Sequence, residues 1–127
     1  MGASTHETMV KEIFAAMEQQ DWDAVVAYYH DDVVVEWPQS GERLQGKEAC
    51  LNVFRNYPDG MPRTMVRRVT GDGDLVVAEG EVAYPDGSTW SAVDIIELRD
   101  GKIIRETSYF AEAFDAPDWR ASMVEAV

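Results

Sequence analysis

Apolar residues between Met9 and Met17 recur every three or four positions, which is the period of a helix that buries one face. Ser4 and Glu7 stand three residues apart just ahead of this run, and this is the spacing of a capping box at a helix N-terminus. The pattern therefore predicts a first helix that begins near Ser4 and packs its apolar face against a core.

Two further helices are predicted by the same period. The second begins after Asp21, a good N-cap residue, and extends to His30, where an imidazole suits the negative end of the helix dipole. The third follows Gly46 and ends ahead of Pro58, because the residue before a proline avoids the helical region. The apolar face of the second helix consists of Trp22, Val25, Val26 and Tyr29, and that of the third consists of Cys50, Val53, Phe54 and Tyr57.

The pattern changes to strands after the second helix. Residues 33–37 alternate between two faces, and residues 63–114 alternate between turns rich in glycine and aspartate, which predicts an antiparallel meander. The expected fold is therefore α+β, a single domain over residues 1–127 with three N-terminal helices packed on a curved antiparallel β-sheet. A short helix that carries Trp119 is expected within residues 115–127.

The 127 residues include 11 Lys and Arg against 24 Asp and Glu, which gives a formal net charge of -13. This charge repels phosphate backbones and anionic headgroups, so nucleic acids and membrane surfaces are not expected as partners. Residues 1–8 show neither a signal peptide nor an anchor, and Cys50 has no second cysteine with which to pair. We therefore expect a cytoplasmic protein that binds no metal and uses no cofactor.

Alternation in the last two strands predicts which polar side chains face the core. The inward face of residues 88–99 contains Trp90, Ala92, Asp94, Ile96 and Leu98, and that of the following strand contains Ile104, Glu106, Ser108 and Phe110. A three-residue loop over residues 99–101 would place Asp94 directly opposite Glu106.

Two opposed carboxylates cannot both ionise without a large cost, so one should hold a proton near neutral pH. In an apolar pocket such a pair suits general acid–base chemistry, with Asp94 and Glu106 as acid and base and Tyr29 orienting an oxygen of the substrate. The alternatives are that a bulge holds the two carboxylates apart, or that one of them forms a structural ion pair. The arginines that could form such a pair are Arg67, Arg68 and Arg105.

A second acid pair, Glu79 and Glu81, lies on the strand over residues 75–84. Turn counting through residues 85–87 places both side chains on the outer face of the sheet, and a bulge would turn them inward. The same outer face carries the apolar residues Val77, Val93 and Ile95. This apolar surface favours a homodimer through the outer face.

The order of these elements, together with four short segments, resembles the nuclear transport factor 2-like superfamily, and within it the SnoaL-like and ketosteroid-isomerase-like branch. The segments are Asp21-Trp22-Asp23-Ala24, His30-Asp31-Asp32-Val33, Leu44-Gln45-Gly46-Lys47-Glu48-Ala49 and Asp100-Gly101-Lys102-Ile103-Ile104-Arg105. The resemblance covers nearly the whole chain. It implies a cone-shaped fold with a deep pocket between sheet and helices, and often a dimer through the outer sheet face.

The steroid isomerases of this superfamily use a tyrosine on the first helix, a carboxylate after the first strand and an aspartic acid late in the chain. The last of these is matched here by Asp94, whereas the other two positions hold Ile13 and Trp37. The epoxide hydrolases use an aspartate in the last strand, at the position where this chain has Ser108. The polyketide cyclases need an acid–base residue in the same cavity, which Asp94 or Glu106 could supply.

Alternation and resemblance together predict a small enzyme of the isomerase, cyclase, dehydratase or hydrolase type, acting on a hydrophobic, cyclic or carbonyl-bearing metabolite. The residues expected to line its pocket are Ile13, Trp37, Phe54, Trp90, Ser108 and Phe110. The alternative is a module of the same fold that binds a small ligand or dimerises and catalyses nothing.

Overall fold

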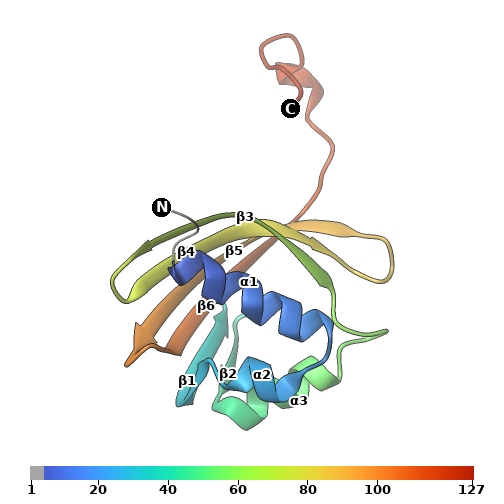
Figure 1. Cartoon of the computed structure of the whole chain (residues 1–127). Coiled ribbons are helices and arrows are strands. Elements are labelled where there is room, and N and C mark those ends of the chain that lie inside the picture. Colours follow the sequence, from blue (N-terminus) through green and yellow to red (C-terminus); the bar gives the residue numbers. More distant parts are fainter. Residues whose placement is uncertain (1–4) are drawn as a thin grey trace.

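The computed structural model describes residues 5–127, in which three helices cover one face of a six-stranded sheet (Figure 1). The helices are α1 (Thr5–Glu18), α2 (Trp22–Val26) and α3 (Lys47–Arg55). The strands are β1 (Tyr29–Trp37), β2 (Glu42–Gln45), β3 (Arg63–Asp72), β4 (Leu75–Ala83), β5 (Thr89–Arg99) and β6 (Lys102–Glu112). The predicted α+β class is confirmed, and Ser4 of the predicted capping box lies outside the described residues.

The core lies between the helices and the inner face of the sheet. α1 contributes the face predicted from its spacing, and its buried residues are Met9, Val10, Ile13, Ala16 and Met17. The sheet contributes alternate residues of its long strands, among them Val76, Ala78, Val82, Ala92 and Ile96. The two periods in the sequence, of about 3.6 and of 2 residues, therefore meet at one apolar layer.

The second helix is shorter than predicted, because it ends at Val26 and the chain then enters β1. The backbone N–H of Ile103 donates to the carbonyl oxygen of Tyr28 at 2.8 Å, and Tyr29 pairs with Ile103 on β6. This pairing with a distant strand outweighs the helical spacing of the local sequence. His30 consequently lies on β1, and the prediction that it ends a helix is wrong.

The strand order in the sheet is β2-β1-β6-β5-β4-β3. Strands β3 to β6 form the predicted antiparallel meander, whereas β1 joins the free edge of β6 in a parallel orientation. Parallel neighbours need a long crossover connection, so no local turn in the sequence announces this pair. The β1–β2 hairpin then extends the sheet by one antiparallel strand.

The β5–β6 hairpin differs from the predicted register by two residues. Its loop is the two-residue turn Asp100-Gly101, in which both residues have positive φ, 53° and 78°. Beyond the turn, Ile104 is an extra residue on β6 that shifts the pairing. Asp94 consequently lies opposite Ser108, and the prediction that it directly faces Glu106 is wrong.

Glu79 and Glu81 are on the outer face of β4, as turn counting predicts. Glu79 forms an ion pair with Arg68 at 2.7 Å, and Glu81 pairs with Arg67 on the same neighbouring strand. The irregularity of this hairpin lies on β3, between Val66 and Arg68, so it leaves the direction of the β4 side chains unchanged.

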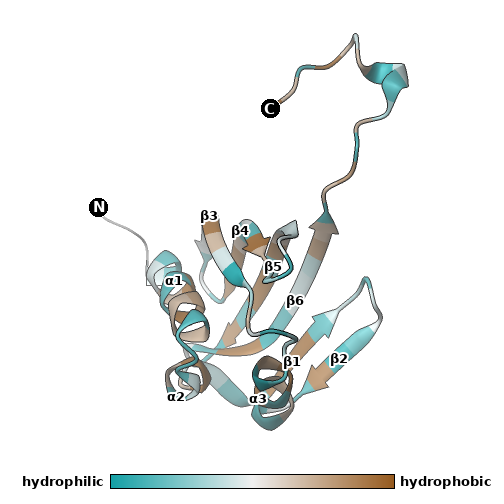
Figure 2. Cartoon of the chain, turned by 90° about the vertical axis from the view of Figure 1, so that its right-hand side faces the viewer, coloured by the Kyte–Doolittle hydropathy of each residue, from teal (hydrophilic) through white to brown (hydrophobic). Residues whose placement is uncertain are grey.

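Residues 113–127 leave the end of β6 and extend away from the domain (Figures 1 and 2). The predicted terminal helix is reduced to one 3-10 turn over Asp118–Arg120. Trp119 is 71% exposed, and the guanidinium of Arg120 lies 5.8 Å from the centre of its ring. Among the helices of the described part of the chain, none is long and apolar enough to cross a membrane.

Candidate functional site

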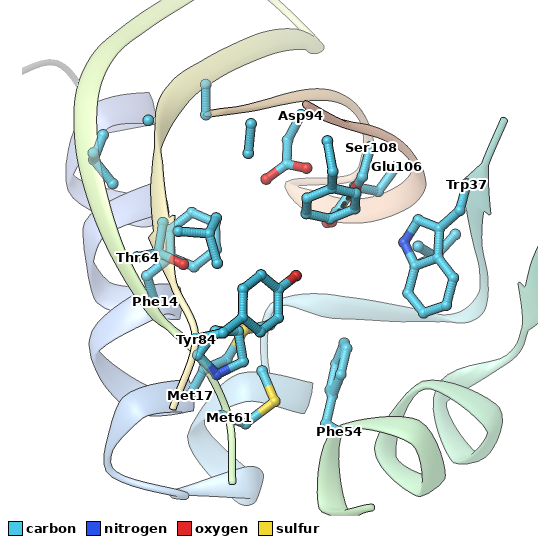
Figure 3. A pocket seen from close by; sticks show the side chains of 18 of the residues that line it. Phe14, Met17, Trp37, Phe54, Met61, Thr64, Tyr84, Asp94, Glu106 and Ser108 are labelled. Atoms are coloured by element: carbon cyan, nitrogen blue, oxygen red, sulfur yellow. Dashed lines mark hydrogen bonds between the residues drawn. The ribbon is translucent and has the colours of Figure 1, made fainter. Parts of the chain in front are cut away.

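A cavity that opens to solvent lies between the inner face of the sheet and the helices (Figure 3). Side chains that form its apolar walls include Phe14 and Met17 on α1, Phe54 on α3, Trp37 on β1 and Phe110 on β6. Asp94, Glu106 and Ser108 bring polar atoms into it from β5 and β6. A space with apolar walls and one polar region suits a small organic molecule.

Ser108 is the link between the two carboxyl groups. It pairs directly with Asp94 across the β5–β6 ladder, and it follows Glu106 by two residues on the same face of β6. Its hydroxyl donates a hydrogen bond to Oε2 of Glu106 at 3.4 Å, and the residue is only 2% exposed. Diagonal neighbours in such a ladder lie about 7 Å apart, within reach of long side chains. The two acids are therefore brought together, with a hydroxyl group between them.

Burial controls the charge of both carboxyl groups. Removal from water raises the pKa of Asp94 to about 6, and together with the nearby charge of Asp94 it raises the pKa of Glu106 to about 8. The Ser108 hydroxyl lowers both pKa values, because it stabilises the ionised forms. Around pH 7 the group therefore shares one proton and carries one negative charge.

Tyr29 lies behind this polar region and is part of the core. The residue is 1% exposed, and its ring packs edge-on against Phe54 with ring centres 6.5 Å apart. Burial and the charge of Glu106 raise its pKa well above the ordinary value, so the phenol stays protonated. Its hydroxyl makes no hydrogen bond to any residue in the described range. Cys50 is a core residue beside the same carboxyl group, and burial raises the pKa of its thiol to about 11.

The structure places the six residues expected to line the pocket in three different settings. The four that line the main cavity are Trp37, Phe54, Ser108 and Phe110. Trp90 lines a second hollow beside the cavity. Ile13 does not line the cavity, because it is buried in the core where α1 packs on the sheet, and the flank of the helix with Phe14 and Met17 faces the cavity instead.

A second hollow of about 630 Å³ shares Ser108 with the main cavity. Trp90 forms part of its wall, and its indole N–H donates to Oγ of Ser88 at 3.1 Å. The Ser88 hydroxyl donates in turn to Asp86 at 2.6 Å, and the ring of Tyr84 meets Trp90 edge-on at 6.0 Å. These contacts hold the indole in one orientation.

Two tyrosines of the cavity were not predicted as pocket residues. Residues 78, 80 and 82 face inward, and Tyr84 is the next position in the same alternation, so the strand pattern could have predicted it. Tyr57 comes just after α3 and continues the apolar face predicted for that helix. Burial, together with the charges of Tyr84 and Asp94, raises the pKa of Tyr57 to about 12, so its phenol is a hydrogen-bond donor in the cavity.

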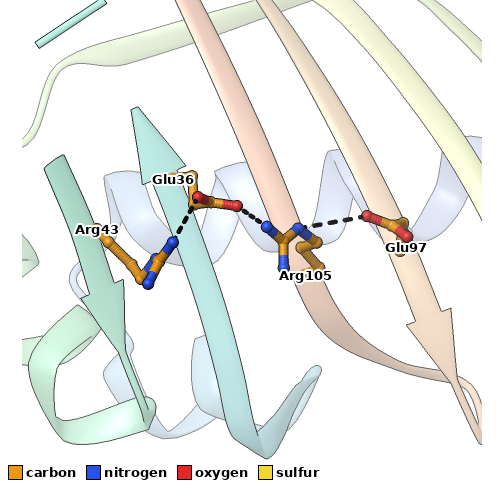
Figure 4. A network of polar contacts seen from close by, with 4 residues as sticks. All are labelled: Glu36, Arg43, Glu97 and Arg105. Carbon is orange, nitrogen blue, oxygen red and sulfur yellow. Dashed lines mark hydrogen bonds and ion pairs between the residues drawn. The ribbon is translucent and has the colours of Figure 1, made fainter. Parts of the chain in front are cut away.

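None of the three arginines considered as ion-pair partners binds the carboxyl groups of the cavity. Arg67 and Arg68 pair with the glutamates of β4 on the outer face. Arg105 lies in a row of charges across the strands, between Glu36 and Glu97 (Figure 4). The ion-pair alternative therefore does not hold. Within residues 5–127, no group of three or more His, Cys, Asp and Glu side chains is arranged to hold a metal ion.

The fold and the cavity define a class of small α+β proteins in which helices and a curved sheet enclose an apolar space. The family model of the SnoaL-like domain matches residues 10–106, and the chain belongs to this family. No curated protein matches the chain.

Solved structures show the same fold over nearly the whole chain. An NTF2-like protein of unknown function from Burkholderia xenovorans is 34% identical, with a TM-score of 0.83 over 96% of this chain and 94% of its own. A protein from Kribbella flavida assigned as a ketosteroid isomerase is 27% identical, with a TM-score of 0.85 over 96% and 89%. A protein from Sinorhizobium meliloti assigned as a polyketide cyclase is 27% identical, with a TM-score of 0.69 over 80% and 93%.

Proposed function

We propose that this protein is a small enzyme that needs no cofactor and performs general acid–base chemistry on an apolar, cyclic or carbonyl-bearing molecule. The observation that carries this proposal is the group formed by Asp94, Ser108 and Glu106 in an apolar cavity. A group that shares one proton near neutral pH can both remove and supply a proton at the same substrate.

Asp94 acts as the base and Glu106 as the acid. Asp94 lies near the cavity residue Tyr57, whereas Glu106 borders the core groups Tyr29 and Cys50, so we assign to Asp94 the removal of a proton from a carbon next to a carbonyl group. Glu106 keeps its proton and donates a hydrogen bond to the oxygen on which negative charge develops. Protonated Asp94 then returns the proton to the substrate at a second atom, while Ser108 keeps both acids in place. Tyr29 does not line the cavity, so it does not contact the substrate, and its ring packs against Phe54 behind Glu106.

The relatives support a reaction of this type. Two of the similar structures belong to proteins assigned as an isomerase and as a cyclase, each 27% identical to this chain. Isomerisation and cyclisation next to a carbonyl group both require a proton to be removed and returned, and dehydration or hydrolysis can use the same acid and base. The shared requirement is a carboxyl group with a raised pKa in an apolar space.

A carbon-detected NMR titration of the Asp94 and Glu106 carboxyl groups tests the proposal. We expect both to titrate above their ordinary ranges, and Asp94→Asn to lower the pKa of Glu106 by removing a neighbouring charge. With a substrate found by screening, Asp94→Asn should abolish turnover and leave the chain folded. Glu97→Gln, on the outer face of the same strand, is the control that should change neither pKa. Two ordinary pKa values would contradict the proposal and favour a module that only binds a ligand.

We also propose that two copies associate through the outer face of the sheet. Val77, Val93 and Ile95 are only partly buried there, and Tyr109 on β6 is exposed. Sedimentation at micromolar concentration should give the mass of two chains, and the mass of one chain would contradict the dimer. Cys50 is a free and buried thiol, which supports a reducing compartment, and we propose the cytoplasm.

A further inference from the structure

The cavity has acidic side chains in its wall and lacks basic ones. Among the described residues that line it or the second hollow there is no lysine, arginine or histidine. Asp94 and Glu106 contribute carboxyl groups, and Glu79 borders the space from β4 while its carboxylate lies on the outer face and pairs with Arg68. An anionic ligand would therefore meet negative charge and find no cation to offset it.

Most basic residues of the chain are engaged on the surface. Seven of the 11 Lys and Arg form ion pairs with acids outside the cavity: Lys11, Arg43, Lys47, Arg63, Arg67, Arg68 and Arg105. The charge shared by Asp94 and Glu106 has no basic partner among these pairs. A buried charge without a partner is unfavourable, so a cation that enters the cavity would be stabilised there. The formal net charge of -13 adds to the negative potential.

Aromatic rings also line the cavity. Trp37, Phe54 and Tyr84 surround the open part of the cavity, with Asp94 and Glu106 on its far side (Figure 3). The face of an aromatic ring attracts a cation, and the attraction grows where water is excluded. An organic cation with an apolar body would thus be stabilised by the walls and by the carboxyl groups together.

We propose that the molecule held in this cavity carries a protonated amine on an apolar ring system, and that molecules with a carboxylate or phosphate are excluded. This inference rests on the proposed function, because it names the charge class of the substrate on which the same carboxyl groups act. Asp94, which lies near the phenol of Tyr57, is the partner of the ammonium group. Glu106 faces the core groups Tyr29 and Cys50 on its other side.

Three ligands with the same ring test the charge preference: 2-naphthylmethylamine, 2-naphthylmethanol and 2-naphthoate. Calorimetric titration of the full chain at pH 7 and physiological salt should show the amine binding about tenfold tighter than the alcohol. Naphthoate should show no binding. Because the amine favours the ionised form of Asp94, its binding at pH 6 should also release protons, which is detected by repeating the titration in buffers of different ionisation enthalpy.

Two variants test whether Asp94 is responsible for the preference for the amine. Asp94→Asn should bring the affinity of the amine down to that of the alcohol and leave the affinity of the alcohol unchanged. Glu97→Gln removes the same charge from the outer face of the same strand, where Glu97 contacts Arg105, and it should keep the full preference for the amine.

The inference would be overturned if the alcohol bound as tightly as the amine, or if naphthoate bound with an affinity similar to that of the amine. It would also be overturned if none of the three ligands bound at millimolar concentration. Raised carboxyl pKa values in the NMR titration without an amine preference would defeat this inference alone. Ordinary pKa values for Asp94 and Glu106 would defeat the acid–base proposal, whichever ligand binds more tightly.

Discussion

Asp94 on β5 lies directly opposite Ser108 on β6, so a hydroxyl group and not a second carboxyl group faces this acid across the sheet. Glu106 is the diagonal neighbour, and the Ser108 hydroxyl donates to it. The hydroxyl has one proton and can donate it to only one carboxylate at a time, so the other acid is stabilised when it is itself protonated. The arrangement links the two acids without forcing their charges into direct contact.

Replacement of Ser108 tests this link. Ser108→Ala should raise the pKa of both Asp94 and Glu106, because the hydroxyl stabilises their ionised forms. The measurement is the NMR titration of the two carboxyl groups. Ser91→Ala, an exposed position on the outer face of β5, is the matched control. Carboxyl pKa values that do not move in Ser108→Ala would show that the hydroxyl does not bind these groups.

The free energy of unfolding should fall as the pH rises from about 4 to about 8. The folded pKa values of Asp94 and Glu106, about 6 and about 8, exceed the ordinary values of 3.8 and 4.5, so the folded state binds more protons in this range. The stabilisation is complete below pH 3.8 and is lost as the pH rises through the folded values. Each pH unit between folded and unfolded pKa corresponds to roughly 1.4 kcal/mol.

Urea unfolding at a series of pH values measures this dependence. Asp94→Asn should flatten the decline, because it removes one of the two carboxyl groups, whereas Glu97→Gln should leave the slope unchanged. A stability that rises across this pH range in the unsubstituted chain would refute the raised pKa values.

Gly80 on β4 lies against the backbone of Met65 on β3. A Cβ at position 80 would overlap the Met65 carbonyl oxygen, and a backbone atom within a sheet cannot swing away. Gly80→Ala should therefore lower the free energy of unfolding by roughly 1–3 kcal/mol. Gly71→Ala is the matched control, because its added Cβ meets the side chain of His6, which can move aside at the cost of one exposed hydrogen bond to the Gly73 carbonyl oxygen. Chemical unfolding compares the two, and equal losses would contradict the explanation.

Removal of residues 113–127 should leave the domain folded. The segment carries five exposed apolar residues: Phe114, Trp119, Met123, Val124 and Val127. Because these side chains lie outside the core, the deletion should change the free energy of unfolding by less than about 0.5 kcal/mol. The fluorescence of the three remaining tryptophans follows the transition at nanomolar concentration, where association is minimal. A loss of about 2 kcal/mol or more would show that the segment packs on the domain.

Several features of the site could be predicted from the sequence. The alternation along β5 and β6 was sufficient to place Asp94, Glu106 and Ser108 on one face, because a shift of two residues preserves the side on which a side chain lies. Turn counting through residues 85–87 placed Glu79 and Glu81 on the outer face of β4, where their ion pairs lie. These predictions depend on which positions are apolar and on the lengths of the connecting turns, so they needed no knowledge of the exact register.

The partner of Asp94 was decided by the tertiary structure. An antiparallel pair was expected with a three-residue loop, but a two-residue turn and a bulge at Ile104 set the register and left Ile103 buried in its place. The bulge shifts the alternation by one residue, but Ile103 and Ile104 are both apolar, so the sequence pattern does not reveal it. The flank of α1 that meets the cavity was also invisible, because Ile13 and Phe14 are both apolar neighbours on one helix.

The sequence by itself determined the three helical segments, the meander and the two faces of its strands. Tertiary structure decided that Tyr29 leaves the second helix to pair in parallel with Ile103, that Ser108 comes to face Asp94, and that both acids lie largely shielded from water. The physical reason is that periodicity is a property of each segment alone. Register, parallel pairing and burial depend on which segments contact each other, and these contacts join segments that are distant in the sequence.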